Sequence, residues 1–483
     1  MNRPSQSSPE SSPESRKANA FHAQAKHALN DATLKKALRN ATDLFAERRT
    51  AAIDSVPDWQ ALREQARLVK DATVARLDHY IEQFADNAEK AGATVHWARD
   101  AKEACTIVTK IAEDNQATRL VKSKSMATEE IHLNKALAKG AREPVETDLG
   151  EWIIQLAGET PSHIIVPAIH MTREAIGELF VDKLGIPPSS DPKTLCKHAR
   201  ERLRNHFAQA DLGISGVNFG VADTGSILIL ENEGNVRMTT TMPKVHVAVM
   251  GIERVIPRFA DLEVFLRLLP RSGTGQHLTT YQSILTGTDN DAYGQGPEQV
   301  HIVLLDNGRS KIAIDEKMRE TLACIRCGAC LNACPVYQTI GGHAYGSVYP
   351  GPIGAILTPQ LAGMHEAKPL PFASSLCGAC KDVCPVKIDI PSLLLELRQR
   401  AVEGTATEPA AKRTWFEAMT WRMWSWFVRG PKRFRFASAM ARFGQRIPIV
   451  HRLLPPMAAW HSTRELPRLA KRSFRDTYKG QAK

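Results

Sequence analysis

Residues 324–335 read CIRCGACLNACP, and residues 377–385 read CGACKDVCP. The first stretch places four cysteines at spacings of three, three and four residues, with a proline directly after the last one. This is the pattern with which bacterial ferredoxins hold a [4Fe–4S] cluster. Three thiolates on one tight loop bind three irons of one cluster, while the fourth cysteine binds a second cluster. The two stretches therefore predict an iron–sulfur protein.

Zinc and disulfide bonds are the alternative uses of closely spaced cysteines. Zinc takes four thiolates, so a single structural zinc leaves three of the seven cysteines in these stretches without a role. Disulfides belong to oxidising compartments, and the chain opens without the charged and apolar segments of a secretory signal. We therefore expect iron–sulfur clusters in a reducing compartment, the cytoplasm.

The second stretch is one ligand short. Its pattern predicts a cysteine three residues before Cys377, and the sequence has Ser374 at that position. If the ligands cross over between the stretches, as in two-cluster ferredoxins, cluster 1 is complete and cluster 2 has three thiolates. The ligands are then Cys324, Cys327, Cys330 and Cys384 for cluster 1, and Cys334, Cys377 and Cys380 for cluster 2. The remaining iron of cluster 2 binds Ser374, water, a substrate or a partner's group, or is absent from a [3Fe–4S] cluster.

The positive charge of the chain is concentrated near its C-terminal end. The 483 residues carry a formal net charge of +11, and residues 401–483 contain 17 lysines and arginines against 5 acidic residues. Five of the eight tryptophans fall in the same segment. No stretch has the long apolar run of a membrane-spanning helix. The basic signal therefore belongs to one segment, in a chain long enough for two or three domains.

Changes in sequence pattern divide the chain into five regions. Residues 1–17 are rich in Ser, Pro and Glu and are expected to be disordered, whereas residues 18–92 have the apolar spacing of helices. Residues 93–306 alternate short apolar runs with helical stretches, which is typical of a layered α/β domain. Residues 307–400 contain both cysteine stretches, and residues 401–483 form a Trp-rich basic segment.

The α/β region is predicted from individual runs of apolar residues. Helices are expected at Ala101–Asn115 and Ala127–Lys139. Several strand candidates are uninterrupted apolar runs, as in strands that helices cover on both faces. The strands are expected at Thr94–Trp97, Leu120–Lys122, Ile153–Gln155, His163–Pro167, Gly216–Ala222, Ser226–Glu231, Lys244–Met250 and Val300–Leu305.

Two polar turns of this region are candidates for a ligand site. Lys122–Ser125 lies at the carboxyl end of a predicted strand, where open α/β sheets place their ligands, and Ala222–Ser226 is a second turn of small polar residues. Their hydroxyl, amide and lysine groups suit a carboxylate or a phosphate. The alternative is that these residues only form turns and cap helices. The sequence contains no dinucleotide-binding, Walker or nucleophile-elbow motif.

The cysteine region is expected to be mainly helical. The 42 residues between Cys334 and Cys377 are rich in Gly and Pro, and a helical pattern at Ile390–Arg400 follows the last cysteine. Minimal two-cluster ferredoxins have a much shorter spacer. The long insertion therefore indicates the helical kind of two-cluster domain, which usually belongs to a larger redox complex.

Several further stretches match a known family. They are Val121–Met126, Glu146–Gly150, Gly216–Pro257 and Arg271–Thr280, together with both cysteine stretches and the Trp-rich tail. In these stretches the chain resembles the lactate-utilisation protein B family, the iron–sulfur subunit of a three-protein system that oxidises L-lactate. The lack of a cysteine at Ser374 is also similar to the usual pattern of that family.

This resemblance implies an α/β lactate-utilisation domain, a helical ferredoxin domain with two [4Fe–4S] clusters, and a family-specific C-terminal segment. It implies electron transfer in the oxidation of L-lactate to pyruvate, as a subunit and not as a self-sufficient enzyme. It also implies two partner proteins, one rich in cysteine and one sharing the α/β domain. The seven cysteines carry over as ligands, whereas no catalytic residue does.

Two other functions remain as alternatives. The chain is then an electron-transfer subunit of a dehydrogenase that acts on another 2-hydroxy acid or on glycerol phosphate, or a redox sensor without enzymatic activity. Where lactate would bind stays open between the two polar turns and the incompletely ligated iron.

The tail has an aromatic and basic composition of its own. Residues 412–429 read KRTWFEAMTWRMWSWFVR, and on a helix Trp415, Met419 and Trp426 share one broad face that arginines flank. Such a composition is typical of a surface that docks on a partner subunit. It also suits peripheral contact with the inner face of the membrane. No nucleic-acid-binding motif accompanies the charge.

Overall fold

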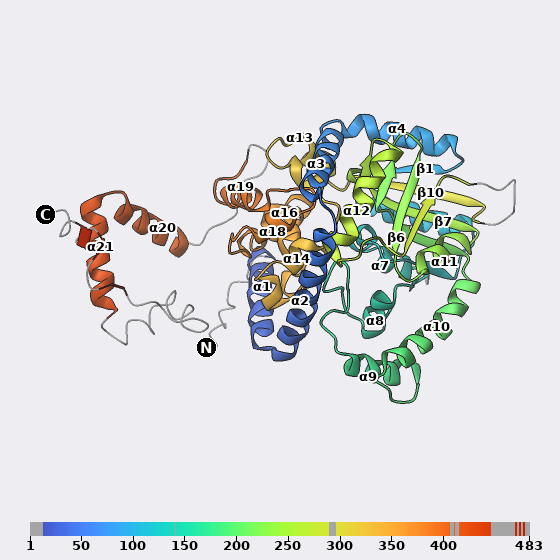
Figure 1. The fold of residues 1–483 in the computed structure, drawn as a ribbon, viewed down its shortest axis with the longest axis horizontal. Helices are drawn as coiled ribbons and strands as arrows, with labels where there is room; N and C mark the ends of the chain where they lie inside the picture. Colours follow the sequence, from blue (N-terminus) through green and yellow to red (C-terminus); the bar gives the residue numbers. More distant parts are fainter. Residues whose placement is uncertain are drawn as a thin grey trace, which may run out of the picture. The chain divides into compact units, whose positions relative to one another are not determined.

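The computed structural model describes residues 13–140, 142–288, 296–405, 410 and 415–445, and six further residues of the tail, 469–470, 473–474 and 477–478. The chain forms two compact units, Met1–Ala411 and Lys412–Lys483. The first unit contains all the strands of the described residues and both cysteine stretches, and Figure 1 shows it as a sheet-containing part next to a helical part. The predicted α/β class is confirmed by this unit.

A six-stranded sheet of parallel strands is the centre of the first unit. Its order is β1-β10-β7-β4-β2-β3, and every neighbouring pair is parallel. The strands are β1 Thr94–Ala98, β10 Gln299–Leu305, β7 Val245–Gly251, β4 Leu212–Gly216, β2 Leu120–Lys122 and β3 Val145–Glu146. Every residue of β4 and β7 is buried, because helices and a second sheet cover the two faces.

Alternate residues of the strand β7 face two different hydrophobic clusters. Val245, Val247 and Val249 pack with residues of α5 (Ala101–Asp114) and α7 (Leu133–Ala138) on one face. Ala248 and Met250 belong to the larger cluster on the other face, which includes α4 (Leu77–Lys90). This two-residue period is the normal consequence of side chains that alternate across a strand. It fixes the register of the sheet, since a shift by one residue would exchange the faces.

A four-stranded sheet covers part of the second face. Its order is β8-β5-β6-β9, with β8 Val255–Ile256, β5 Phe219–Val221, β6 Ser226–Glu231 and β9 Tyr281–Leu285. The predicted run Gly216–Ala222 is divided in the structure. Its first residue ends β4 of the large sheet, and β5 of the small sheet begins three residues later.

Two of the predicted strands are wrong. Ile153–Gln155 belongs to the helix α8, Leu149–Ala157, which Asp148 caps by accepting the N–H of Glu151 and which Gly158 ends in a left-handed conformation. His163–Pro167 forms turns without a strand. A short apolar run has no periodicity that separates a buried helix from a strand. Here the apolar side chains of α8 pack against α9 (Arg173–Leu184) and α10 (Pro192–Ala208).

The remaining helices of the α/β part also differ from the prediction in their bounds. The helix expected at Ala127–Lys139 is two helices, α6 (Met126–Glu130) and α7, separated at His132, whose φ of 54° is left-handed. The other helices are α11 Asn235–Thr241, η1 Ile252–Arg254, η2 Phe259–Asp261 and α12 Leu262–Gly273.

Four helices precede the sheet. They are α1 Pro13–Asn30, α2 Ala32–Asp54, α3 Trp59–Ala75 and α4, with Pro57 between α2 and α3. Helix α1 begins within the segment predicted to be disordered, and residues 1–12 lie outside the described part. Helix α4 contacts β1 and β8, whereas α1 to α3 contact helices of the cysteine region. The N-terminal helices predicted for residues 18–92 therefore also pack against the cysteine region.

Short helices form the cysteine region, as expected for residues 307–400. They are α13 Arg309–Ile314, η3 Arg319–Ala323, α14 Ala329–Asn332, α15 Tyr337–Ile340, η4 His343–Tyr345, α16 Gly351–Ala362, α17 Met364–Ala367, η5 Leu370–Phe372, α18 Ala379–Val383 and α19 Ile390–Glu403. The second unit contains α20 Trp415–Val428 and α21 Pro431–Gly444. No described helix has the length and hydropathy required to cross a bilayer.

Candidate metal centres and the adjoining cavity

The two cysteine loops share two left-handed backbone positions. Arg326 and Leu376, which each precede a cysteine, have φ values of 59° and 57°, and the glycines after those cysteines are also left-handed. Successive turns of this kind direct backbone N–H groups inward, as in many iron–sulfur sites. The N–H of Arg326 donates to Cys324 Sγ at 3.4 Å, and the N–H of Leu376 donates to Ser374 Oγ at 3.1 Å. Ser374 therefore has the position in its loop that Cys324 has in the first.

Four thiols from both stretches surround one small cavity. Its lining includes Cys324, Cys327, Cys330 and Cys384, with isoleucines such as Ile353 and Ile388 completing an apolar wall. The N–H of Ile388 donates to Cys384 Sγ at 3.4 Å. Burial raises the pKa of Cys384 to about 11, and the neighbouring Cys324 thiol adds to the rise. Such thiols become thiolates when a cation compensates their charge, so this cavity fits a cationic iron–sulfur core.

The other three thiols of the two stretches lie close to one another. Burial raises the pKa of Cys380 to about 12, and the thiols of Cys334 and Cys377 raise it further. The pKa of Cys334 is also raised, first by burial and then by Cys377. Cys380 adds in turn to the raised pKa of the buried Cys330 thiol, which lines the first cavity. The two groups of thiols are therefore neighbours, and Cys377 is the exposed member.

The spacing of the thiols does not fit a single zinc ion. A tetrahedral zinc site with bonds of about 2.3 Å brings its sulfurs to about 3.8 Å from one another. All nine cysteines are described, and no three of their sulfurs lie within 4.8 Å of one another. Among the described residues the only group at that spacing is Glu159, His170 and His343. A preformed zinc arrangement of three thiols is therefore absent among the described cysteines.

Helix α3 holds the loop that contains Cys384. Arg63, a buried residue of α3, donates from Nε and Nη2 to the carbonyl of Cys384 at 3.0 and 2.6 Å, and from Nη2 to the carbonyl of Asp382 at 3.0 Å. Lys70, about two turns further along α3, donates to the carbonyl of Glu253 at 2.7 Å. One helix therefore binds both the second cysteine loop and the end of β7. Sequence reasoning missed this role of the N-terminal helices.

Buried charges join the first cysteine loop to the sheet. Glu253 follows β7 and accepts from Arg309 Nε at 2.6 Å and from Arg326 Nη2 at 3.3 Å. Arg309 also pairs with Glu130 at 2.8 Å, and the Tyr349 hydroxyl donates to Glu130 at 2.7 Å. The positive neighbours Arg309 and Arg326 lower the pKa of Glu253 to about 2 although burial opposes this. The network is therefore ionised at neutral pH.

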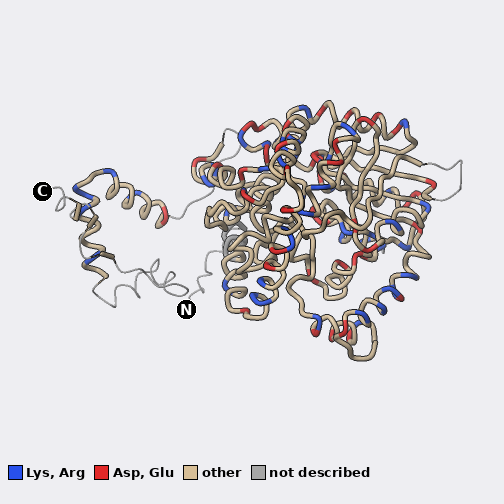
Figure 2. The backbone as a smooth tube through the Cα atoms, viewed as in Figure 1, with Lys and Arg blue, Asp and Glu red and all other residues tan. Residues whose placement is uncertain are grey.

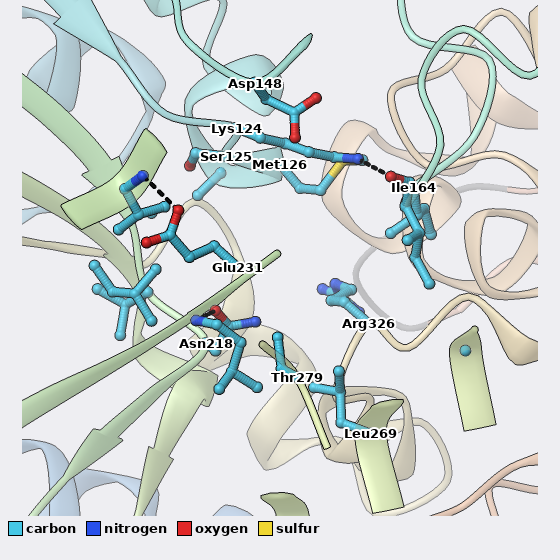
Figure 3. A pocket seen from close by; sticks show the side chains of 18 of the residues that line it. Lys124, Ser125, Met126, Asp148, Ile164, Asn218, Glu231, Leu269, Thr279 and Arg326 are labelled. Atoms are coloured by element: carbon cyan, nitrogen blue, oxygen red, sulfur yellow. Dashed lines mark hydrogen bonds between the residues drawn. The ribbon is translucent and has the colours of Figure 1, made fainter. Parts of the chain in front are cut away.

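A cavity of about 370 Å³ lies beside this network. It opens at the carboxyl ends of β2, β4 and β7, and its lining includes Ser125, Asn218, Glu231, Arg254 and Arg326. Figure 3 shows polar side chains from several elements around an open centre. Arg326 lines this cavity as well as the one between the four thiols. The position agrees with the rule for open α/β sheets, in which ligands bind at the carboxyl edge.

The structure separates the two polar turns that were considered as one site. Lys124 and Ser125 of the first turn line the cavity. Lys122 does not, because it is buried in ion pairs with Glu146 and Glu129 at 2.9 and 3.0 Å. The second turn, Ala222–Ser226, does not line the cavity and instead accepts hydrogen bonds from Asn87 of α4. The residues that follow β6 line the cavity instead of this second turn.

Comparison with known proteins finds three family models that match successive parts of the chain. Residues 81–305 match the LUD domain, residues 320–388 a 4Fe-4S dicluster domain, and residues 396–483 the C-terminal region of lactate utilisation protein B. Lactate utilization protein B of Bacillus pumilus (strain SAFR-032) is 41% identical over 475 residues, which cover 96% of this chain and 98% of that protein. Lactate utilization protein B 1 of Bacillus mycoides (strain KBAB4) is 42% identical and covers 96% of each chain. The chain belongs to the lactate utilization protein B family.

Membership of the lactate utilization protein B family confirms the resemblance seen in the sequence. A third relative, from Geobacillus kaustophilus (strain HTA426), is 42% identical over 94% of this chain and 95% of its own. The dicluster match covers all seven cysteines of the two stretches. Sequence reasoning missed Arg254, Arg326 and Tyr349, because they come together only in the fold. The position of Arg326 between two cysteines was the one feature of the sequence that could have indicated its place in the site.

His163 gives a test of how the α/β part supports the cysteine loops. Its ring nitrogen Nδ1 accepts hydrogen bonds from the N–H groups of Ile165 and Val166. Its Nε2 lies 3.1 Å from the amide oxygen of Asn332, a residue of the first cysteine stretch. Burial lowers the pKa of His163 to about 3. The unfolded chain therefore binds a proton below about pH 6.5 that the folded chain does not bind, and stability falls as the pH falls from there towards about 3.

We expect the unfolding free energy in urea to decrease by up to about 1.4 kcal/mol per pH unit below pH 6.5 through this group. His163→Gln removes that component, so the difference between pH 7.5 and pH 5.5 becomes smaller. His206→Gln, an exposed change on α10, serves as the control and keeps the normal difference. Equal pH dependence in all three proteins would contradict the role of His163.

Proposed function

We propose that this chain is the iron–sulfur electron-transfer subunit of a complex that oxidises L-lactate to pyruvate. The observation that carries the proposal is the convergence of the seven cysteines of both stretches into two adjacent groups. Iron–sulfur clusters supply transfer of single electrons, which removes a pair of electrons from a two-electron oxidation one at a time. Membership of the lactate utilization protein B family supports lactate as the source of those electrons.

The residues that would hold the clusters follow from the grouping of the thiols. We assign Cys324, Cys327, Cys330 and Cys384 to the first cluster, because they surround one cavity. Cys334, Cys377 and Cys380 then hold the second cluster, with the Ser374 hydroxyl as the group at the fourth corner. The protein contributes ligation, burial and backbone N–H groups directed at sulfur, as for Cys324 and Cys384.

We expect Cys327→Ala to remove the first cluster and lactate-dependent electron flow while the α/β part stays folded. The variant should lose about half of the iron per chain, because one of two clusters lacks a ligand. Cys196→Ala, which removes an exposed thiol on α10, is the matched control. Iron analysis and electron paramagnetic resonance of anaerobically purified protein provide the measurement, with circular dichroism to follow the fold. Full iron content and activity in Cys327→Ala would refute the assignment.

Ser374 is tested by replacing its hydroxyl with a thiol or with hydrogen. Ser374→Cys should keep the iron content and change the spectrum of the second cluster, because a thiolate then occupies all four corners. Ser374→Ala should lower the iron per chain during exposure to air, since the fourth iron has lost its protein ligand. Identical spectra and identical iron loss in the natural protein and both variants would show that Ser374 does not bind the cluster.

The tail is proposed to dock on a partner subunit. We propose two partners, another cysteine-rich protein and a protein that shares the α/β domain. Helix α20 exposes Trp421 and Trp424 by 56% each, and it has no buried residue. Figure 2 shows lysines and arginines along α20 and α21 with few acidic residues. Exposed tryptophan with arginine is the composition of interface cores.

Replacing Trp421 and Trp424 by serine should weaken capture of the partner proteins at least about tenfold, as expected when hot-spot residues are lost. Trp97→Ser, which removes a half-exposed tryptophan from β1, is the control and should leave capture unchanged. Sedimentation with vesicles of anionic phospholipid provides the second measurement. Vesicle binding that depends on the tryptophans, with partner capture unaffected, would show that the tail contacts a membrane instead.

A further inference from the structure

The cavity beside the first cysteine loop has a surplus of positive charge at one end. Arg254, Arg309 and Arg326 all line it there, and all three pair with the single carboxylate of Glu253, at 3.8, 2.6 and 3.3 Å. Glu130 satisfies the remaining nitrogens of Arg309. Arg254 and Arg326 have no such second carboxylate among the described residues. Buried charges without full pairing are costly, so this end of the cavity favours an anion.

Hydrogen-bond donors at this end are also unused. Nε and Nη1 of Arg326 and Nη1 of Arg254 are buried and have no hydrogen-bond partner among the described residues. Arg326 is 93% buried, since its exposed fraction is 7%, and its guanidinium lies 4.8 Å from the centre of the Tyr349 ring. The ring and Glu253 hold the guanidinium in a fixed orientation, which Figure 3 shows directed into the open centre of the cavity. A carboxylate has two oxygens, so one carboxylate can accept a charge-assisted hydrogen bond from each of the two guanidinium groups.

The rest of the lining combines apolar side chains, such as Ile229 and Leu269, with polar and acidic ones. Glu231 accepts the N–H groups of Val236 and Arg237 at 2.7 and 3.0 Å, and Glu233 accepts the N–H of Leu149 at 3.0 Å. Neutral acceptors and donors, Asn218, Gln276 and Thr279, also line the cavity. A ligand that fits both parts has a carboxylate for the guanidinium groups and a hydroxyl group for the polar part. The ligand must fit a cavity of about 370 Å³, a volume within the range of small-molecule sites.

We propose that this cavity binds a small 2-hydroxycarboxylate, with its carboxylate held by Arg254 and Arg326. The inference rests on the proposed function, because it locates the substrate of that function on this chain and next to the first cluster. Arg326 would then contact the ligand on one side and line the cluster's cavity on the other. The competing explanation is that the two guanidinium groups only balance the negative charge of four thiolates.

The test is direct binding to the full chain, purified anaerobically with its iron–sulfur centres and titrated calorimetrically. L-Lactate and pyruvate should bind saturably, and L-lactate should bind more tightly than acetate or inorganic phosphate. Arg326→Gln and Arg254→Gln should each weaken L-lactate binding at least about tenfold, because a charged hydrogen-bonding partner is lost. Arg173→Gln, at an arginine that is 68% exposed and pairs with its neighbour Glu174, should leave binding unchanged.

Arg254 lies outside both cysteine loops, so its variant keeps the test valid if Arg326→Gln loses iron. Iron is therefore counted in each variant before titration. Absence of saturable binding, binding that Arg254→Gln leaves unchanged, or acetate and phosphate binding as tightly as L-lactate would each overturn the proposal. A change in the cluster's potential with unchanged lactate binding would also overturn it, in favour of charge balance alone.

Failure of this inference is distinguishable from failure of the proposed function. If the partner proteins and L-lactate reduce the clusters of this chain, but the isolated chain binds no lactate, the substrate site lies on a partner and only the inference fails. If the chain binds lactate through Arg254 and Arg326 but its clusters are not reduced with the partners present, the electron-transfer function fails.

Discussion

The buried carboxylate of Glu253 is the interaction on which the rest of this structure depends. It lies in the short helix η1 that follows the fully buried strand β7, and it pairs with Arg309, at the start of the cysteine region, and with Arg326, inside the first cysteine loop. Truncating one member of a buried ion pair usually costs about 3–5 kcal/mol, because the other charge is left uncompensated. These ion pairs therefore link the sheet to the cysteine loops, and movement of one would change the charge environment of the other.

The N-terminal helices complete this unit from the other side. Arg63 binds carbonyl groups of the second cysteine loop, and Lys70 of the same helix binds the carbonyl of Glu253. The thiols thus converge between a strand end and a helix that are far apart in the sequence. Side chains that are held in this way lose little entropy when a cluster forms, so the site is organised by the whole first unit and not by the cysteine loops alone.

The sequence predicted those features that depend on local spacing or on long periodic segments. The cysteine spacing identified the chemistry, and the runs at Leu120–Lys122, Ser226–Glu231 and Val300–Leu305 became strands. The apolar run Ile153–Gln155 was misassigned because three residues have no distinguishable period, and capping by Asp148 made it a helix. The cavity was beyond prediction for a different reason. Arg254 and Arg326 lie 72 positions apart, and only the sheet's topology brings them to one opening.

The unequal exposure of the thiols has a consequence for the route of charge through the molecule. In the first group of thiols Cys327, Cys330 and Cys384 are buried and Cys324 is partly buried, whereas in the second group Cys377 is exposed beside the buried Cys334 and Cys380. Electron tunnelling weakens steeply with distance, so a soluble carrier exchanges charge fastest with whichever redox centre approaches the solvent. If the chain carries electrons as proposed, a soluble carrier would exchange them at the Cys377 side, and the centre between the buried thiols would be shielded from oxidants in the solvent.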